Sequence, residues 1–83
     1  MKQQILIVED NEHNLYLLTY LLEHAGFEVS QARDGRTAIA WATAHEAPAL
    51  VILDIELPEM DGYDVARTLR SIPKFEAPIV GAG

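Results

Sequence analysis

The sequence predicts an α/β fold built on an open parallel β-sheet. Two short apolar runs, residues 5–8 and 50–53, are continuous rather than alternating, which is typical of strands buried on both faces. Segments with helical spacing separate the predicted strands, and this alternation indicates right-handed crossovers between parallel strands. Both apolar runs lead directly into carboxylates, Glu9-Asp10 and Asp54, and open parallel sheets bind ligands at the carboxyl ends of their strands.

Predicted strands and helices alternate along the whole chain, in the order β-α-β-α-β-α-β. The strands are expected at residues 3–8, 27–32, 49–53 and 77–82. The helices are expected at residues 12–25, 36–45 and 63–71. No sequence repeat or linker interrupts this order, so the chain is expected to form one domain.

The first helix has the clearest start and stop signals. Asn11 is the predicted N-cap, and Gly26 is predicted to end the helix. Four apolar residues recur at helical spacing and are expected to face inward: Leu15, Leu18, Leu22 and Ala25. Three more widen the apolar surface beyond one stripe: Leu17, Tyr20 and Leu21.

Turn residues set the remaining boundaries. Asp34-Gly35 is a cap and turn signal before the alanine-rich second helix, and Pro48 separates that helix from the third strand. Residues 58–62 are expected to form a loop, in which Gly62 lets the chain bend into the third helix. Val65, Ala66 and Leu69 are expected to face inward from this helix, Pro73 follows its end, and Pro78 opens the last strand.

Composition limits the classes of function. The 83 residues carry six basic against thirteen acidic side chains, and the net charge of −7 argues against a nucleic-acid partner. Without cysteine there is no disulfide framework or thiolate metal site. No apolar run approaches the roughly 20 residues that span a bilayer, and the N-terminus lacks a signal-peptide pattern. We therefore expect a soluble, cytoplasmic protein with no membrane partner.

The carboxylates at the strand ends are the candidate site. If the two strands are neighbours, Glu9, Asp10 and Asp54 come together and repel, and a divalent cation that prefers oxygen ligands relieves the repulsion. Taken alone, Glu9-Asp10 is more simply explained as part of a solvated turn or helix start, and Asp54 as a helix cap. The three histidines share no spacing and are expected at the surface: His13, His24 and His45.

Two segments together resemble the receiver domain of bacterial response regulators. They are Ile-Leu-Ile-Val-Glu-Asp-Asn at residues 5–11 and Val-Ile-Leu-Asp-Ile-Glu-Leu-Pro-Glu-Met-Asp-Gly at residues 51–62. The resemblance extends from about Lys2 to Ala82, nearly the whole chain. It implies a flavodoxin-like, doubly wound parallel sheet, here with strand order 2-1-3-4.

The resemblance also implies a function. Asp54 would accept a phosphoryl group from a histidine kinase or a phosphotransfer protein, so the chain would be a phosphoacceptor in two-component signalling rather than an enzyme. Asp10 and Asp54 would bind Mg²⁺ directly, Glu9 through water, and Glu56 through its backbone carbonyl. Carboxylate chemistry agrees with this assignment, because aspartate can act as a nucleophile towards phosphorus.

The sequence departs from the family at its end. The family fold continues to a fifth strand, so residues 1–83 are expected to form a receiver domain that lacks the last strand and the last two helices. Gly83 occupies the position of the family's phosphoryl-binding hydroxyl, and the family's lysine after the fifth strand has no counterpart. We therefore expect phosphorylation to switch the output poorly or differently.

Two other functions fit the sequence. The first is a receiver-derived interaction module that self-associates or blocks a kinase without phosphorylation. Under either function we expect a homodimer, which would bury Leu17 and Leu21 or pair the fourth strands edge to edge, and we favour burial of the two leucines. The second is a magnesium-dependent phosphohydrolase with an aspartyl nucleophile. That class usually has a second aspartate two residues after the first, where this chain has Glu56, so it ranks last.

Overall fold

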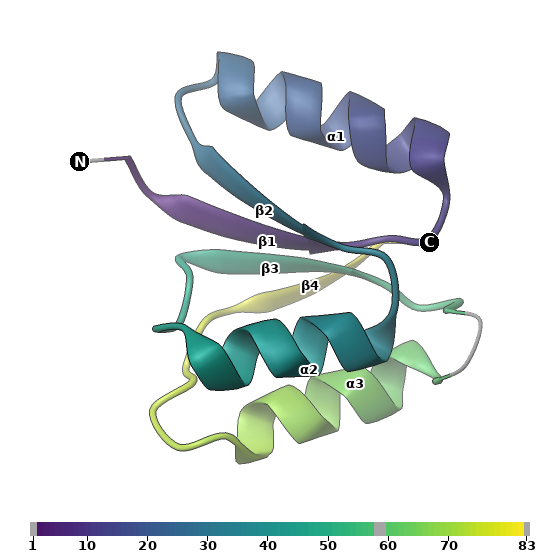
Figure 1. Ribbon diagram of the computed structural model, residues 1–83, viewed down its shortest axis with the longest axis vertical. Helices are drawn as coiled ribbons and strands as arrows, with labels where there is room; N and C mark the ends of the chain where they lie inside the picture. The colour runs from purple at the N-terminus through teal and green to yellow at the C-terminus, as the bar shows by residue number, and fades with distance from the viewer. Residues whose placement is uncertain (1, 58–59, 83) are drawn as a thin grey trace.

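The computed structural model describes residues 2–57 and 60–82, and its elements alternate as predicted (Figure 1). The strands are β1 (Gln4–Val8), β2 (Glu28–Ala32), β3 (Leu50–Asp54) and β4 (Ile79–Ala82). The helices are α1 (Glu12–His24), α2 (Gly35–Ala44) and α3 (Gly62–Ser71). Predicted boundaries differ from these by one or two residues at most ends, and Asp54 belongs to β3 rather than following it.

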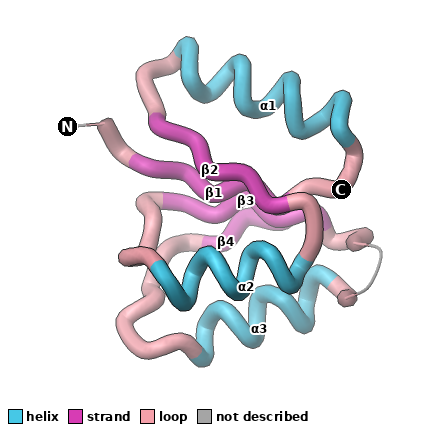
Figure 2. The backbone as a smooth tube through the Cα atoms, in the orientation of Figure 1, coloured by secondary structure: helices cyan, strands magenta, loops and turns pink. Residues whose placement is uncertain are grey.

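The sheet is fully parallel, with strand order β2-β1-β3-β4, as the predicted fold class requires (Figure 2). β1 lies between β2 and β3, and its register pairs Ile5 with Leu50 and Val8 with Leu53. The carboxyl ends of β1 and β3 therefore lie side by side. This adjacency, which the sequence alone left conditional, positions the candidate site.

Helices cover both faces of the sheet. α1 lies on one face, and α2 and α3 lie together on the other (Figure 1). The larger buried cluster, on the α2 and α3 face, includes Leu6, Val51 and Leu69. The smaller cluster lies under α1 and contains Ile5, Ile7 and Leu15, with Leu18 and Leu22 packed against it. The central strands are thus buried from both sides, which explains their continuous apolar sequences.

Side-chain caps fix the start of each helix. The Asn11 side chain accepts a hydrogen bond from the Asn14 backbone N–H at 3.0 Å, which confirms the predicted N-cap of α1. Asp34 caps α2 and Asp61 caps α3 in the same way. Ala25 was predicted to face inward but is exposed, because α1 ends at His24 and Ala25 is its C-cap.

Gly62 has a different role from the one predicted. Its φ angle is not in the left-handed region, so backbone freedom is not the reason for glycine. A Cβ atom at this position would lie 2.6 Å from the Ile55 Cα and 2.8 Å from the Asp54 carbonyl oxygen. Glycine is required because α3 begins in direct contact with the end of β3.

We predict that Gly62→Ala destabilises the fold by about 2 kcal/mol, because the backbone of one of the two elements must shift. Urea unfolding followed by circular dichroism measures the change. Gly81→Ala is the matched control, since its added Cβ meets only the flexible Ile55 side chain at 3.2 Å. Equal stability of the two variants would contradict this role of Gly62.

Candidate metal centre

Three carboxylates meet where β1 and β3 end. Glu9 and Asp10 follow β1, and Asp54 is the last residue of β3. One carboxylate oxygen from each lies within 4.8 Å of the other two. The sequence predicted this group, and the observed strand order brings all three members together.

Glu9 is the most enclosed of the three. Only 8% of its surface is exposed, and its backbone N–H donates to the Ala32 carbonyl of β2 at 2.9 Å. Its carboxylate accepts a hydrogen bond from the Asn11 N–H at 3.2 Å. Burial raises the pKa of Glu9 above its usual value, the Asn11 N–H opposes that shift, and the Asp54 carboxylate adds to it. Ionisation of Glu9 in this buried position beside Asp54 is therefore unfavourable.

Asp54 is held by the backbone that follows it. Its Oδ1 atom accepts a hydrogen bond from the Glu56 N–H at 3.0 Å. Glu56 also forms an isolated antiparallel bridge with Asp61, and the Gly62 N–H donates to the Ile55 carbonyl at 3.0 Å. The chain after β3 thus turns back on itself and fixes one oxygen of the Asp54 carboxylate.

The Glu56 side chain is exposed, whereas its backbone belongs to the site. The contact is made by the Glu56 N–H, which donates to Asp54, and the expected role of the Glu56 carbonyl as a metal ligand stays a prediction. Met60 packs against the larger buried cluster. Pro58 and Glu59 lie outside the described residues, and so does Gly83, the position of the expected missing hydroxyl. The altered switching output therefore stays a prediction.

One ion pair at this edge of the sheet was not anticipated. Arg33, directly after β2, pairs with Glu12 in the first turn of α1, and the pKa of Glu12 is lowered as a result. Because β2 ends at the same edge as β1, a basic residue at position 33 was the signal that could have indicated the contact. All three histidines are exposed, as predicted, and none joins the carboxylate cluster.

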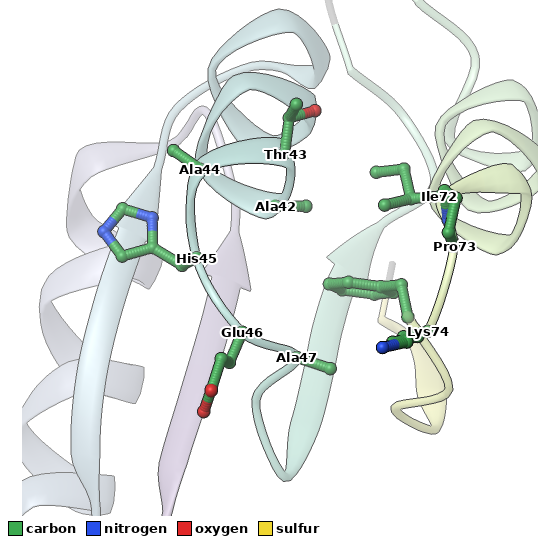
Figure 3. Close-up of a pocket in the computed structure, with 10 residues that line it drawn as sticks. Ala42, Thr43, Ala44, His45, Glu46, Ala47, Ile72, Pro73 and Lys74 are labelled. Atoms are coloured by element: carbon green, nitrogen blue, oxygen red, sulfur yellow. The ribbon is translucent and has the colours of Figure 1, made fainter.

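A groove lies at the edge of the sheet opposite the carboxylate cluster. Figure 3 shows a groove between the end of α2 and the segment after α3, with a volume of about 500 Å³. Phe75 is buried against it, and His45, Glu46 and Lys74 contribute its polar atoms. These groups carry mixed charges and lie near the amino ends of β3 and β4, so the groove is separate from the carboxylate cluster.

Comparison with known proteins identifies the family. The family described as "response regulator receiver domain" matches this chain over residues 5–81. The chain belongs to this family, which acts in two-component signalling. The chain is 43% identical over 80 residues to the alkaline phosphatase synthesis transcriptional regulatory protein PhoP of Bacillus subtilis, covering 96% of this chain and 32% of that protein. It is 40% identical over 70 residues to the polar-differentiation response regulator DivK of Brucella anthropi, covering 84% of this chain and 56% of that protein.

A solved structure shows the same fold with a metal. The receiver domain of a sensor histidine kinase from Pseudomonas aeruginosa, solved with a magnesium ion coordinated in its active-site cleft, is 30% identical. The two structures superpose with a TM-score of 0.91 over 98% of this chain and 66% of the other. This chain thus spans about a third to about a half of the two curated relatives. No helix in the described part of the chain is long and apolar enough to cross a membrane.

We predict that Glu9→Gln raises the thermal midpoint of the metal-free chain by a few degrees at about pH 7. The pKa of Glu9 is raised by folding, so its favourable contribution is complete below the unfolded pKa and is lost as the pH rises through the folded pKa. Glutamine stays neutral and keeps an acceptor for the Asn11 N–H.

Thermal scans of both proteins at about pH 7 and about pH 4 without divalent cations measure the difference. The advantage of the variant should shrink at the lower pH. A variant that is less stable than the wild type at both pH values would show that the ionised Glu9 carboxylate does not destabilise the fold.

Proposed function

We propose that Asp54 accepts a phosphoryl group from a histidine kinase or a phosphotransfer protein, with Mg²⁺ bound at the same edge of the sheet. The observation that carries this proposal is the convergence of three carboxylates within 4.8 Å at the ends of two neighbouring strands. The family membership supports it, since phosphoryl acceptance and Mg²⁺ binding are general to receiver domains. A structural relative with magnesium in its cleft supports the choice of metal.

The donor set fits Mg²⁺. All three side chains in the cluster offer oxygen, and Mg²⁺ is typically bound by one or two carboxylates together with water and phosphate oxygens. We assign Asp10 and Asp54 as direct ligands, Glu9 as a ligand through water, and the Glu56 backbone carbonyl as the remaining protein ligand. When bound, the metal supplies positive charge that offsets both the carboxylate repulsion and the charge of the phosphoryl group.

Asp54 is positioned as a nucleophile. The Glu56 N–H holds Oδ1 at 3.0 Å and so fixes the carboxylate plane, which leaves Oδ2 to attack phosphorus. A bond forms between Oδ2 and phosphorus while the bond from phosphorus to the donor nitrogen breaks, and the electron pair returns to the donor imidazole. Asp54 is only half-buried and is the last residue of β3, which supports the approach of a donor to this carboxylate.

We predict that Asp54→Asn abolishes labelling by a small phosphodonor in the presence of Mg²⁺, because the amide is a far weaker nucleophile than the carboxylate. Intact-mass measurement with peptide mapping checks this result. Asp61→Asn is the control, since asparagine also caps a helix and Asp61 is outside the cluster. Full labelling of Asp54→Asn, or a phosphoryl group mapped to Asp10, would refute the assignment.

We predict that Mg²⁺ binds weakly and that Asp10→Ala weakens it further by roughly tenfold or more, because a charged oxygen ligand is lost. The Mg²⁺-dependent rise in thermal midpoint gives the affinity of each protein. Glu46→Gln is the control, because Glu46 is exposed and lies near the amino end of β3. Unchanged affinity in Asp10→Ala would remove Asp10 from the ligand set.

A second candidate function is a self-associating module that acts without phosphorylation. The specific observation is the exposed apolar surface of α1, where Tyr16 is 65% and Leu21 is 61% exposed. Labelling at Asp54 separates the two functions. A chain that binds no Mg²⁺ and takes up no phosphoryl group, yet associates, would support this second function alone.

A further inference from the structure

Met60 joins the starts of two helices beside the candidate metal centre. It directly precedes Asp61, the N-cap of α3, and its side chain packs against the larger buried cluster. Its Sδ atom lies 3.1 Å, and its Cβ atom 3.3 Å, from the position that a Cβ atom on Gly35 would occupy. Gly35 is buried and is the first residue of α2, which lies beside α3 (Figure 1). The Met60 thioether therefore fills space between the start of α2 and the start of α3.

This contact is close on its buried side. The same Cβ position on Gly35 lies 2.7 Å from the Cγ2 atom of Val65, a fully buried residue of α3. Met60 and Val65 thus both pack directly against the glycine, in an interior that accepts extra volume only if neighbouring groups shift. An oxygen atom on the Met60 sulfur would make this side chain larger and polar, and would therefore weaken the apolar contact with α2 and α3.

The backbone around Met60 also orients the proposed acceptor. Glu56 and Asp61 form an isolated antiparallel bridge, and Met60 lies between them in the chain. The Glu56 N–H donates to the Oδ1 atom of Asp54 at 3.0 Å. A shift of the Met60 side chain is therefore expected to reach the backbone that fixes the Asp54 carboxylate.

Met60 is also open to a small oxidant. The residue is half-buried rather than enclosed. The sequence contains two methionines and no cysteine, and Met60 is the one methionine within residues 2–57 and 60–82. In a chain without thiols, methionine sulfur is the group that a mild peroxide oxidises most readily. Met60 is thus a sulfur at which oxidation can alter a packed contact.

We propose that Met60 is a modification site, at which a hydroperoxide oxidises the sulfur to the sulfoxide and thereby slows phosphoryl acceptance at Asp54. One peroxide oxygen bonds to sulfur while the O–O bond breaks, and the other oxygen leaves with the proton as water or an alcohol. Sulfur loses two electrons and the peroxide gains them, and methionine sulfoxide reductases reverse the change. The effect on acceptance rests on the proposed function, whereas the effect on packing does not.

Limited treatment with hydrogen peroxide tests the site. Peptide mapping should place one oxygen atom on Met60, and the oxidised chain should lose a few degrees of thermal midpoint. With Mg²⁺ and a small phosphodonor, labelling of Asp54 should become roughly threefold to tenfold slower, because the carboxylate is less well oriented. Treatment with reductases for both sulfoxide epimers should restore the rate and the midpoint of the untreated chain.

Two variants separate oxidation at Met60 from oxidation elsewhere. Met60→Leu nearly conserves the apolar volume and has no sulfur at this position, so peroxide should change neither its midpoint nor its labelling rate. Met60→Gln places a polar group there without peroxide, and it should reproduce the slower labelling and the lower midpoint. Circular dichroism checks that both variants fold.

Three results would overturn the proposal. The first is oxidation of Met1 that leaves Met60 unmodified. The second is a chain with oxidised Met60 whose midpoint and labelling rate equal those of the untreated chain. The third is an equal loss in peroxide-treated Met60→Leu, which would place the sensitive group elsewhere.

Failure of the proposed function has a different result, because the untreated chain would then take up no phosphoryl group at all. In that case a lower midpoint after oxidation would still support the Met60 site, and an unchanged midpoint would overturn it.

Discussion

Parallel pairing of β1 with β3 is the constraint on which the site depends. The register that joins Val8 to Leu53 is set by apolar side chains buried on both faces of the sheet. A shift of one residue would exchange those faces, so core packing resists it strongly. The same register places Glu9, Asp10 and Asp54 at neighbouring strand ends, where one oxygen from each lies within 4.8 Å of the other two. The core therefore supplies the free energy that holds three mutually repelling groups together.

The close approach of the carboxylates forms the candidate site but lowers the stability of the fold. The buried Glu9 carboxylate has a raised pKa, so its ionisation opposes folding near neutral pH. A cation bound at the proposed site would offset that cost. The backbone around Asp54 contributes by fixing one carboxylate oxygen through the Glu56 N–H and by bringing α3 against β3 at Gly62. The site is thus made from strand ends and close backbone contacts, with few side chains committed to it.

The sequence predicted much of this because several of its signals are local. Continuous apolar runs marked the strands. Asn11 marked the start of α1, because its side chain contacts the backbone of Asn14, only three residues further along the chain. The strand order 2-1-3-4 came from the resemblance, since periodicity alone does not tell which strands are neighbours. Features that depend on distant residues were missed. The ion pair of Arg33 with Glu12 and the true role of Gly62 both needed the three-dimensional arrangement of separate elements.

We propose that the three carboxylates act as one metal-assisted acceptor site. The most direct measurement is the amount of phosphoryl group on wild-type Asp54, mapped by mass spectrometry after incubation with a phosphodonor in Mg²⁺ or in a chelator. We expect modification at Asp54 that depends on Mg²⁺ and is lost in the chelator. Equal modification under both conditions, or modification confined to residues outside the cluster, would contradict it.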